Sequence, residues 1–190
     1  MSEISFEDRT VIVTGAGNGL GKAYAIELGN RGAKVVVNDL GGSVDGSGSG
    51  STPADEVVNE IIANGGEAVA NYDSVATKDG GEAIVQTAID SFGTVDAVIN
   101  NAGILRDKSF AKMTEEELSL IIDVHLKGTF FVSQPAFRVM KEKNYGRIVN
   151  VASPSGLFGN FGQSNYGAAK MGIVGLTNVL AIEGAKYNIK

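Results

Sequence analysis

Short apolar runs alternate with longer amphipathic stretches along the chain. The short runs are rich in β-branched residues, which favours strands, and they cover residues 11–14, 34–39, 68–72, 95–100 and 147–152. Few polar residues interrupt them, as is typical of parallel strands that are buried on both faces of a sheet.

The stretches between these runs carry helical periodicity and helix-end signals. Thr52 is predicted as an N-cap before Pro53, and Thr114 opens a capping box with Glu117. The predicted helices cover residues 20–30, 53–63 and 78–92, a segment from Thr114 to beyond Leu126, and residues 164–187. This regular alternation predicts an α/β fold with a doubly wound parallel sheet, in a single domain over residues 1–190.

Two segments depart from the alternation. Residues 41–51 are a glycine- and serine-rich patch inside one strand–helix–strand unit, so we expect a surface loop near the strand ends rather than a linker. Residues 188–190 follow the last helix and resemble the beginning of a further strand. We therefore expect a piece of a longer protein, whose sheet lacks its last one or two strands here.

The composition excludes several classes of function. The chain has 16 Lys and Arg against 22 Asp and Glu, a net charge of −6, which argues against nucleic acid or an anionic membrane as partner. It has no cysteine and one histidine, so we expect no disulfide and no metal site. No apolar run is long enough for a membrane span, and residues 1–8 lack the basic and apolar regions of a signal peptide.

Glycine is unusually frequent, and several glycines lie in one loop. Residues 14–21 read TGAGNGLG, directly after a predicted strand and at the start of a predicted helix. Glycines allow a tight turn and close approach of the backbone to a pyrophosphate, and a helix N-terminus offers N–H groups to the anion. We expect Gly15, Asn18, Gly19 and Leu20 to bind a dinucleotide; the alternative is a turn that binds nothing.

The residues at the ends of the other strands extend this hypothesis. Asp39 ends the second strand, where a carboxylate accepts hydrogen bonds from ribose hydroxyls and repels a 2′-phosphate, so we predict NAD rather than NADP. Asp39 as a capping residue is the alternative. Ligands of such sheets bind outside the carboxyl ends of the strands. The other expected cofactor-binding residues lie there: Asp73, Ser74, Asn100, Ala102 and Gly103.

Candidate catalytic groups follow the fifth predicted strand. Tyr166 and Lys170 are four residues apart and so share one face of a helix, and Ser153 lies 13 residues before the tyrosine. An ammonium beside a phenol favours the phenolate, which makes Tyr166 a candidate general acid/base. Ser153 is not in a Gly-x-Ser-x-Gly turn, which excludes the usual serine hydrolase arrangement.

In order and spacing, these motifs resemble those of the short-chain dehydrogenase/reductase family, which has a Rossmann-type fold. The resemblance covers essentially the whole chain. It implies that Tyr166 transfers the proton, that Ser153 orients the reacting oxygen, and that Lys170 binds the nicotinamide ribose and assists the tyrosine. The family usually has asparagine in a proton relay at the position of His125, so His125 either replaces it in the relay or only packs there.

Several segments are similar to one branch of the family, the (3R)-hydroxyacyl-CoA dehydrogenases of peroxisomal multifunctional enzymes and their bacterial relatives. These segments are residues 38–42, 70–75, 101–109, 124–126 and 156–166. The resemblance implies NAD-dependent oxidation of (3R)-3-hydroxyacyl-CoA to 3-ketoacyl-CoA in β-oxidation. It also implies a homodimer or homotetramer, in the cytoplasm of a bacterium or the peroxisome of a eukaryote.

Three alternatives remain open at this point. Two are other oxidoreductases of the family, a hydroxysteroid dehydrogenase and a 3-oxoacyl-carrier-protein reductase. Asp39 argues against the second, since that reductase generally uses NADPH. The third is a catalytically silent module that binds NAD.

Overall fold

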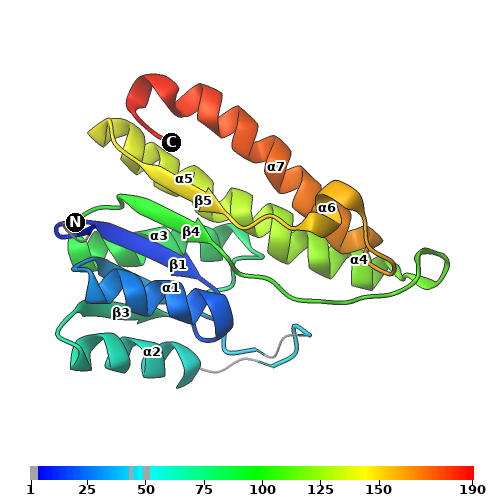
Figure 1. The fold of residues 1–190 in the computed structure, drawn as a ribbon, viewed down its shortest axis with the longest axis horizontal. Helices are drawn as coiled ribbons and strands as arrows, with labels where there is room; N and C mark the ends of the chain where they lie inside the picture. The colour runs from blue at the N-terminus through cyan, green and yellow to red at the C-terminus, as the bar shows by residue number, and fades with distance from the viewer. Residues whose placement is uncertain (1–3, 43–44, 49–51) are drawn as a thin grey trace.

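The computed structural model describes residues 4–42, 45–48 and 52–190. Its five strands form one parallel sheet in the order β3-β2-β1-β4-β5 (Figure 1). The strands are β1 (Thr10–Thr14), β2 (Lys34–Asn38), β3 (Glu67–Asn71), β4 (Ala97–Asn100) and β5 (Arg147–Asn150). Each agrees with a predicted run to within two residues at either end, so the predicted doubly wound sheet is confirmed.

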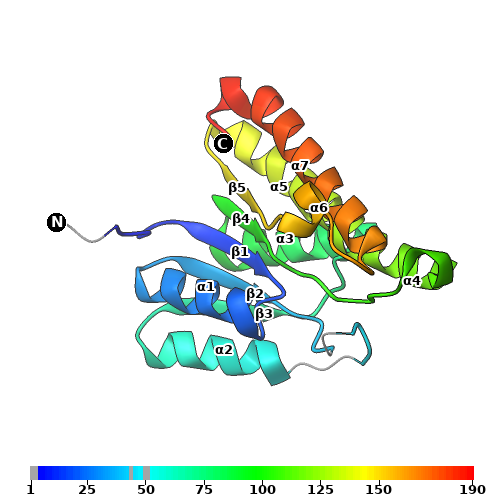
Figure 2. The same cartoon turned by 45° about the vertical axis from the view of Figure 1, so that its right-hand side comes forward.

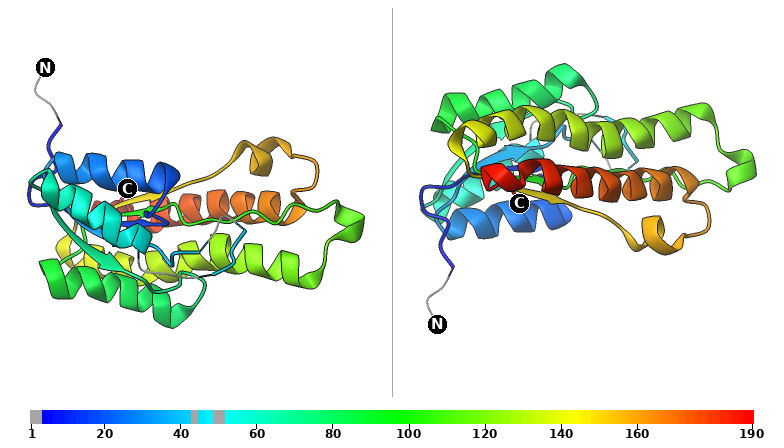
Figure 3. Two further views of the ribbon diagram at one scale, coloured as in Figure 1. Left: turned by 90° about the horizontal axis from the view of Figure 1, so that it is seen from below. Right: turned by 90° about the horizontal axis from the view of Figure 1, so that it is seen from above.

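Helices cover both faces of the sheet, which explains the nearly continuous apolar character of the strands. Val11 and Val13 of β1 belong to the core beneath α1 (Gly19–Asn30) and α2 (Thr52–Ala63). Ile12 belongs to the core beneath α3 (Lys78–Phe92) and α5 (Gly128–Lys143). Figure 3 shows α1 and α3 on opposite sides of the sheet, and α7 (Ser164–Gly184) lies beside α5 at the β5 end (Figures 1 and 2).

The helix predicted after Thr114 is longer and less regular than expected. The predicted capping box is present: the Glu117 N–H donates to Thr114 Oγ1, and the Thr114 N–H donates to Glu117 Oε2. The helix begins as α4 (Glu115–Ile121), continues as the π-helical segment η2 (Ile122–Lys127), and leads into α5 without a break. A π-helical turn admits an extra residue, and apolar spacing alone does not reveal it.

Several short elements and helix ends differ from the prediction. The sequence analysis missed η1 (Phe110–Lys112) and α6 (Pro154–Phe158), because each is too short to show periodicity. The last predicted helix ends at Gly184 and is followed by η3 (Ala185–Tyr187). Thr52, predicted as an N-cap, is already the first residue of α2.

The chain after η3 lies along β5. Ile189 forms a parallel bridge with Gly146, and the Ile148 N–H donates to the Lys190 carbonyl at 2.9 Å. This segment therefore runs where the sequence analysis expects a further strand to begin.

In the predicted loop over residues 41–51, the described residues 45–48 are exposed, as expected of a surface loop. Residues 43–44 and 49–51 of this loop lie outside the described part of the chain. Residues 1–3, the start of the segment that lacks signal-peptide features, also lie outside it. Among the residues that the structure describes, no helix is both long and apolar enough to cross a membrane. The same residues contain no cluster of three or more His, Cys, Asp or Glu side chains that could hold a metal ion.

Candidate active site

The glycine-rich loop joins β1 to α1 at the carboxyl edge of the sheet. Gly15 has a φ of +62°, and a Cβ atom there would lie 2.7 Å from the Cα atom of Ala102. Gly19 has a φ of +54° but faces open space, and Leu20 beside it is 62% exposed. Asn18, the N-cap of α1, makes no side-chain capping hydrogen bond. The first turn of α1 therefore keeps backbone N–H groups available on the open side, as a bound pyrophosphate requires.

Asn101 holds this loop from the end of β4. Its Nδ2 donates to the carbonyl oxygens of Thr14 and Gly15, both at 3.1 Å. In return, Thr14 Oγ1 accepts from the N–H groups of Asn101 and Ala102, both at 3.1 Å. The sequence analysis assigns no role to either side chain. The signal that could have found them is a polar residue at the end of each of two strands, once β1 and β4 are known to be neighbours.

Asp39 is oriented toward the glycine loop. Its Oδ2 accepts from the Gly17 N–H at 2.7 Å, and its Oδ1 accepts from the Gly41 N–H at 2.8 Å. Each carboxylate oxygen has a second lone pair, so both ribose hydroxyls can still donate to it. The carboxylate is thus preorganised within the region where the sequence analysis places the adenosine ribose.

Asp73 and Ser74 follow β3 and are held by buried asparagines. The Asn71 Nδ2 donates to Asp73 Oδ2 at 2.8 Å, and the Asn38 Nδ2 donates to the Asp73 carbonyl at 2.9 Å. Ser74 Oγ accepts from the Ala76 N–H at 3.3 Å. These bonds fix the turn at the end of β3, on the same edge of the sheet as Asp39.

Asn100 differs from the other predicted cofactor-binding residues, because its side chain lies in the interior. Its Nδ2 donates to Ser133 Oγ of α5 and to Asn150 Oδ1 of β5, both at 2.8 Å. Asn150 in turn donates to Thr177 Oγ1 of α7 at 2.8 Å. Asn100 and Asn150 together thus tie α5 and α7 to the sheet. Of the neighbouring predicted residues, Ala102 is partly buried and Gly103 is exposed.

Tyr166 and Lys170 lie together in the first turns of α7. Lys170 is only 3% exposed, and its Nζ donates to the Val151 carbonyl at 2.6 Å. The same Nζ lies 5.6 Å from the centroid of the Tyr166 ring. Burial lowers the pKa of the Lys170 ammonium to about 8. The structure thus brings a buried cation to the phenol that the sequence analysis selects as acid/base.

Ser153 lies shortly after β5, which ends at Asn150, and it is the N-cap of α6. Its Oγ accepts from the Ser155 N–H at 3.2 Å. The helix α6 crosses α7 closely, because a Cβ atom at Gly156 would lie 2.9 Å from the Met171 nitrogen and 3.1 Å from Lys170 Cβ. This crossing anchors the segment that carries Ser153 against the turn of α7 that carries Lys170.

Asn165, which the sequence analysis missed, fixes the start of α7. It is 1% exposed, and its Nδ2 donates to the carbonyl oxygens of Arg106 and Glu117, both at 3.0 Å. Its Oδ1 accepts from the Tyr166 N–H at 2.7 Å. Its position directly before the candidate tyrosine could have indicated a role for Asn165. The burial of Asn165, however, depends on the loop after β4 and on α4.

His125 lies in the π-helical segment and is 3% exposed. Its ring meets the Tyr166 ring edge to face, with the centroids 5.1 Å apart. Its Nε2 lies 3.0 Å from the Ile104 nitrogen and 2.8 Å from the Ile104 carbonyl oxygen. Burial, reinforced by the Lys170 charge, lowers the pKa of the imidazole to about 4.

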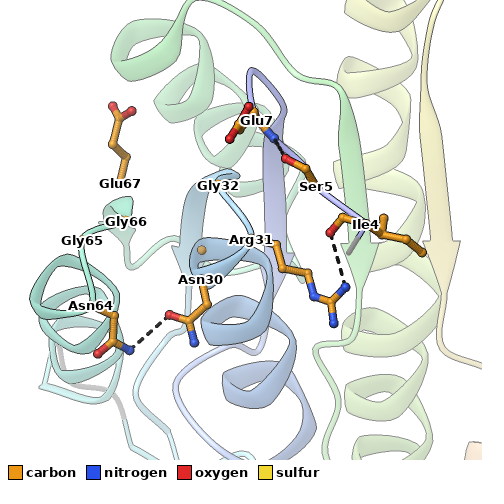
Figure 4. A pocket seen from close by; sticks show the side chains of 11 residues that line it. Ile4, Ser5, Glu7, Asn30, Arg31, Gly32, Asn64, Gly65, Gly66 and Glu67 are labelled. Atoms are coloured by element: carbon orange, nitrogen blue, oxygen red, sulfur yellow. Dashed lines mark hydrogen bonds between the residues drawn. The ribbon is translucent and has the colours of Figure 1, made fainter. Parts of the chain in front are cut away.

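A hollow lies at the opposite edge of the sheet, near the amino ends of the strands (Figure 4). It encloses about 380 Å³. The Asn64 Nδ2 donates to Asn30 Oδ1 at 3.2 Å, and the Arg31 Nη1 donates to the Ile4 carbonyl at 3.3 Å. This hollow contains none of the predicted site residues.

Comparisons with known proteins agree with this geometry. The sequence profile of the family described as short chain dehydrogenase matches residues 9–190. The peroxisomal hydratase-dehydrogenase-epimerase of Saccharomyces cerevisiae is 62% identical over 98% of this chain, which spans 20% of that protein. The peroxisomal multifunctional enzyme type 2 of Mus musculus is 57% identical over 99% of this chain, which spans 25% of that protein.

A solved structure shows the same fold. The short chain dehydrogenase from Mycobacterium avium superposes with a TM-score of 0.90 at 46% identity, over 97% of this chain and 65% of that one. The resemblance to the short-chain dehydrogenase/reductase family is therefore confirmed. It rests on the profile match over residues 9–190, on the identity to these relatives and on the superposition. The chain belongs to the short chain dehydrogenase family.

Proposed function

We propose that this domain oxidises a secondary alcohol to a ketone, with NAD as the hydride acceptor. The observation that carries the proposal is the pair of Tyr166 and the buried Lys170 at the same sheet edge as the glycine loop. When bound, NAD supplies the acceptor for the hydride that leaves the alcohol carbon. The protein's own residues bind the two molecules and move the hydroxyl proton.

Tyr166 takes the hydroxyl proton of the alcohol as the carbonyl forms. The Lys170 ammonium favours the phenolate that accepts this proton, and its hydrogen bond to the Val151 carbonyl holds it in place. Ser153 donates a hydrogen bond to the reacting oxygen. Because Asn165 fixes the backbone at Tyr166, the phenol is held for the reaction with little reorganisation.

The residues of the site fit NAD better than NADP. The Asp39 carboxylate is held in place by two backbone N–H groups and is free to accept from ribose hydroxyls. A 2′-phosphate at this position would meet that negative charge, and neither Asn18 nor Leu40 provides a cation to balance it. Gly15, Gly19 and the N-terminus of α1 would hold the pyrophosphate.

The proposed substrate is a (3R)-3-hydroxyacyl-CoA, which is oxidised to 3-ketoacyl-CoA in β-oxidation. The support is the high identity to relatives named hydratase-dehydrogenase-epimerase and multifunctional enzyme. For a eukaryotic source, the names of these relatives favour the peroxisome, and for a bacterial source we propose the cytoplasm.

We also propose a homodimer or homotetramer that pairs through α5 and α7. Phe130 on α5 is 48% exposed, and Val179 and Ile182 on α7 are 50% and 79% exposed. Pairing would remove these apolar side chains from water. Light scattering that finds only monomers of the complete protein would contradict this arrangement.

The proposed reaction is tested by following NADH formation with the complete gene product. The substrates are the (3R) and (3S) hydroxyacyl-CoA, each with NAD and with NADP. We expect turnover with NAD and the (3R) enantiomer. Turnover of free steroids alone would instead support a hydroxysteroid dehydrogenase, and NAD binding without turnover would support the silent module.

A further inference from the structure

Three phenylalanines of this chain are almost fully exposed to solvent. Phe110 of η1 is 84% exposed, and Phe158 of α6 and Phe161 in the loop after it are 86% and 89% exposed. The other five of the eight phenylalanines are at most half exposed. Single apolar side chains are common at a surface, but three aromatic rings on adjoining segments are typical of a binding surface.

The two segments that carry these rings are tied to each other. Lys108 forms a parallel bridge with Gln163, and its N–H donates to the Gly162 carbonyl at 2.8 Å. The Gln163 Nε2 donates to Asp107 Oδ2 at 2.8 Å, and Gln163 Oε1 accepts from Ser155 Oγ of α6 at 2.8 Å. The segment before η1 is therefore bonded to the loop between α6 and α7, and through Gln163 to α6 itself.

The phenylalanine rim, which comprises Phe110, Phe158 and Phe161, adjoins the candidate catalytic groups. Ser153 precedes Phe158 by five residues, which is about 8 Å along a helix, and Tyr166 follows Phe161 by five residues. Both α6 and the start of α4 lie beyond the carboxyl ends of the strands (Figures 1 and 2). A long substrate whose reacting oxygen is held at the catalytic groups therefore has these rings within its reach.

The segment before α4 is also locally basic in an acidic protein. Residues 105–113 carry three basic side chains and one acid, whereas the whole chain has a net charge of −6. Lys108 pairs with Glu117 at 3.5 Å, but Lys112 has no ion-pair partner among the described residues. The acids at 115–117 lie in the first turn of α4, where the helix N-terminus stabilises them. Exposed rings beside a cation suit a ligand with an apolar chain and an anionic end.

We propose that the phenylalanine rim binds the fatty chain of the acyl-CoA substrate and gives the enzyme a preference for long chains, while Lys112 attracts the phosphates of CoA. This inference rests on the proposed function, because that function places the reacting oxygen at Ser153 and Tyr166. A chain that covers the rings leaves water together with them, and each buried methylene group strengthens binding by up to about 4-fold. A chain too short to reach the rings gains nothing from them.

The chain-length dependence of turnover tests the rim. The complete protein is assayed with NAD and with four-carbon and twelve-carbon (3R)-3-hydroxyacyl-CoA, as wild type and as the double variant Phe158→Ser/Phe161→Ser. The variant should lower kcat/KM for the twelve-carbon substrate about 10-fold or more and change the four-carbon value by less than about 2-fold. Ile62→Ser, at a 53% exposed position of α2, is the matched control and should change neither value. Equal changes for both chain lengths, or no change for either, would overturn the proposal.

Light scattering on the same double variant separates a fatty chain from a second copy of this protein as the group that covers the rings. Both side chains are exposed, so the variant should fold, and it should keep the oligomeric state of wild type. Dissociation into smaller species would show that the rings pair subunits, and would overturn the assignment to the substrate.

Binding without turnover provides an independent readout. Calorimetry with NAD present should show that the double variant weakens binding of dodecanoyl-CoA about 10-fold and leaves binding of free CoA unchanged. Lys112→Ala should weaken both ligands about 3-fold at low salt and less at high salt. If no hydroxyacyl-CoA turns over while these affinities change as expected, the proposed reaction fails and the role of the rim stands. Turnover of both chain lengths with unchanged dodecanoyl-CoA binding in the double variant would leave the reaction in place and overturn the rim.

Discussion

At the carboxyl edge of the sheet, the half that we expect to bind the cofactor and the half that carries the candidate catalytic groups differ in their structural elements and in their burial. The cofactor half comprises residues 14–21, Asp39 and residues 73–74, and it includes glycines with positive φ and a backbone N–H that holds the Asp39 carboxylate. The catalytic half comprises His125, Ser153, Tyr166 and Lys170, whose side chains come from the π-helical segment, the N-cap of α6 and helix α7. Those of His125 and Lys170 are almost fully buried. We therefore expect substitutions in the first half to act mainly on cofactor binding, and substitutions in the second half to act mainly on rate.

The largest expected effect is on the catalytic side. Tyr166→Phe removes the hydroxyl that exchanges the proton and should lower kcat about a thousand-fold. The Kd for NAD should stay within about 2-fold of wild type, because the ring itself is retained. Tyr187→Phe, on η3, is the control and should retain activity. A Tyr166→Phe enzyme that keeps most of its rate would remove the acid/base assignment.

The next effect is on the cofactor side. Gly15→Ala places a Cβ atom against the Ala102 backbone at a positive φ, which should cost about 2 kcal/mol of folding free energy. Binding of NAD should weaken with it, because the loop must shift. Gly19→Ala is the matched control for stability, since Gly19 has a similar φ but open space around it. Equal melting temperatures for the two variants would contradict the close approach at Gly15.

Asp39→Ala should reduce the preference for NAD over NADP about 10-fold or more, because it removes both the ribose acceptor and the charge that repels a 2′-phosphate. The measurement is the ratio of kcat/KM with the two cofactors. Asp90→Asn, on α3, is a charge control that should leave the ratio unchanged. A preference that survives Asp39→Ala would show that other groups discriminate between the cofactors.

The last expected effect concerns the stability of the catalytic half rather than turnover or cofactor binding. Burial lowers the pKa of Lys170 from 10.5 to about 8, so the folded protein releases this proton before the unfolded chain does as pH rises. Above about pH 8 the unfolded chain binds more protons, and stability rises with pH. Relative to Lys170→Met, the wild-type free energy of unfolding should gain about 2 kcal/mol between about pH 7.5 and about pH 9.5. Urea denaturation at both pH values tests this, and parallel behaviour of the two proteins would contradict the burial cost.

The two halves also differ in how far they can be predicted from sequence. The glycine loop depends on neighbouring residues and on a strand–loop–helix pattern, so both its position and its residues were visible. Tyr166 and Lys170 share a helical face, so their proximity was visible too. That Lys170 is buried was not, since its burial depends on β5 and on the packing of α7.

Residues that act across the fold escaped prediction or were placed differently. Asn101 and Thr14 meet only because β1 and β4 are neighbours, although β4 follows three other strands in the chain. Asn100 has the sequence position of a cofactor contact, yet its side chain bonds inward to α5 and β5. Successive strand residues point to opposite sides, and the partners on each side come from distant segments.

The sequence by itself determined the alternation of strands and helices, the parallel sheet, the glycine loop and the identity of the candidate acid/base. These depend on local periodicity, on glycine turns and on helical spacing. The tertiary structure alone decided which side chains are buried, where the asparagines bond, and that a π-helical turn brings His125 against both Gly103 and Tyr166. Those features depend on the packing of segments that are far apart in the chain. A local sequence pattern does not show which distant segments will be in contact.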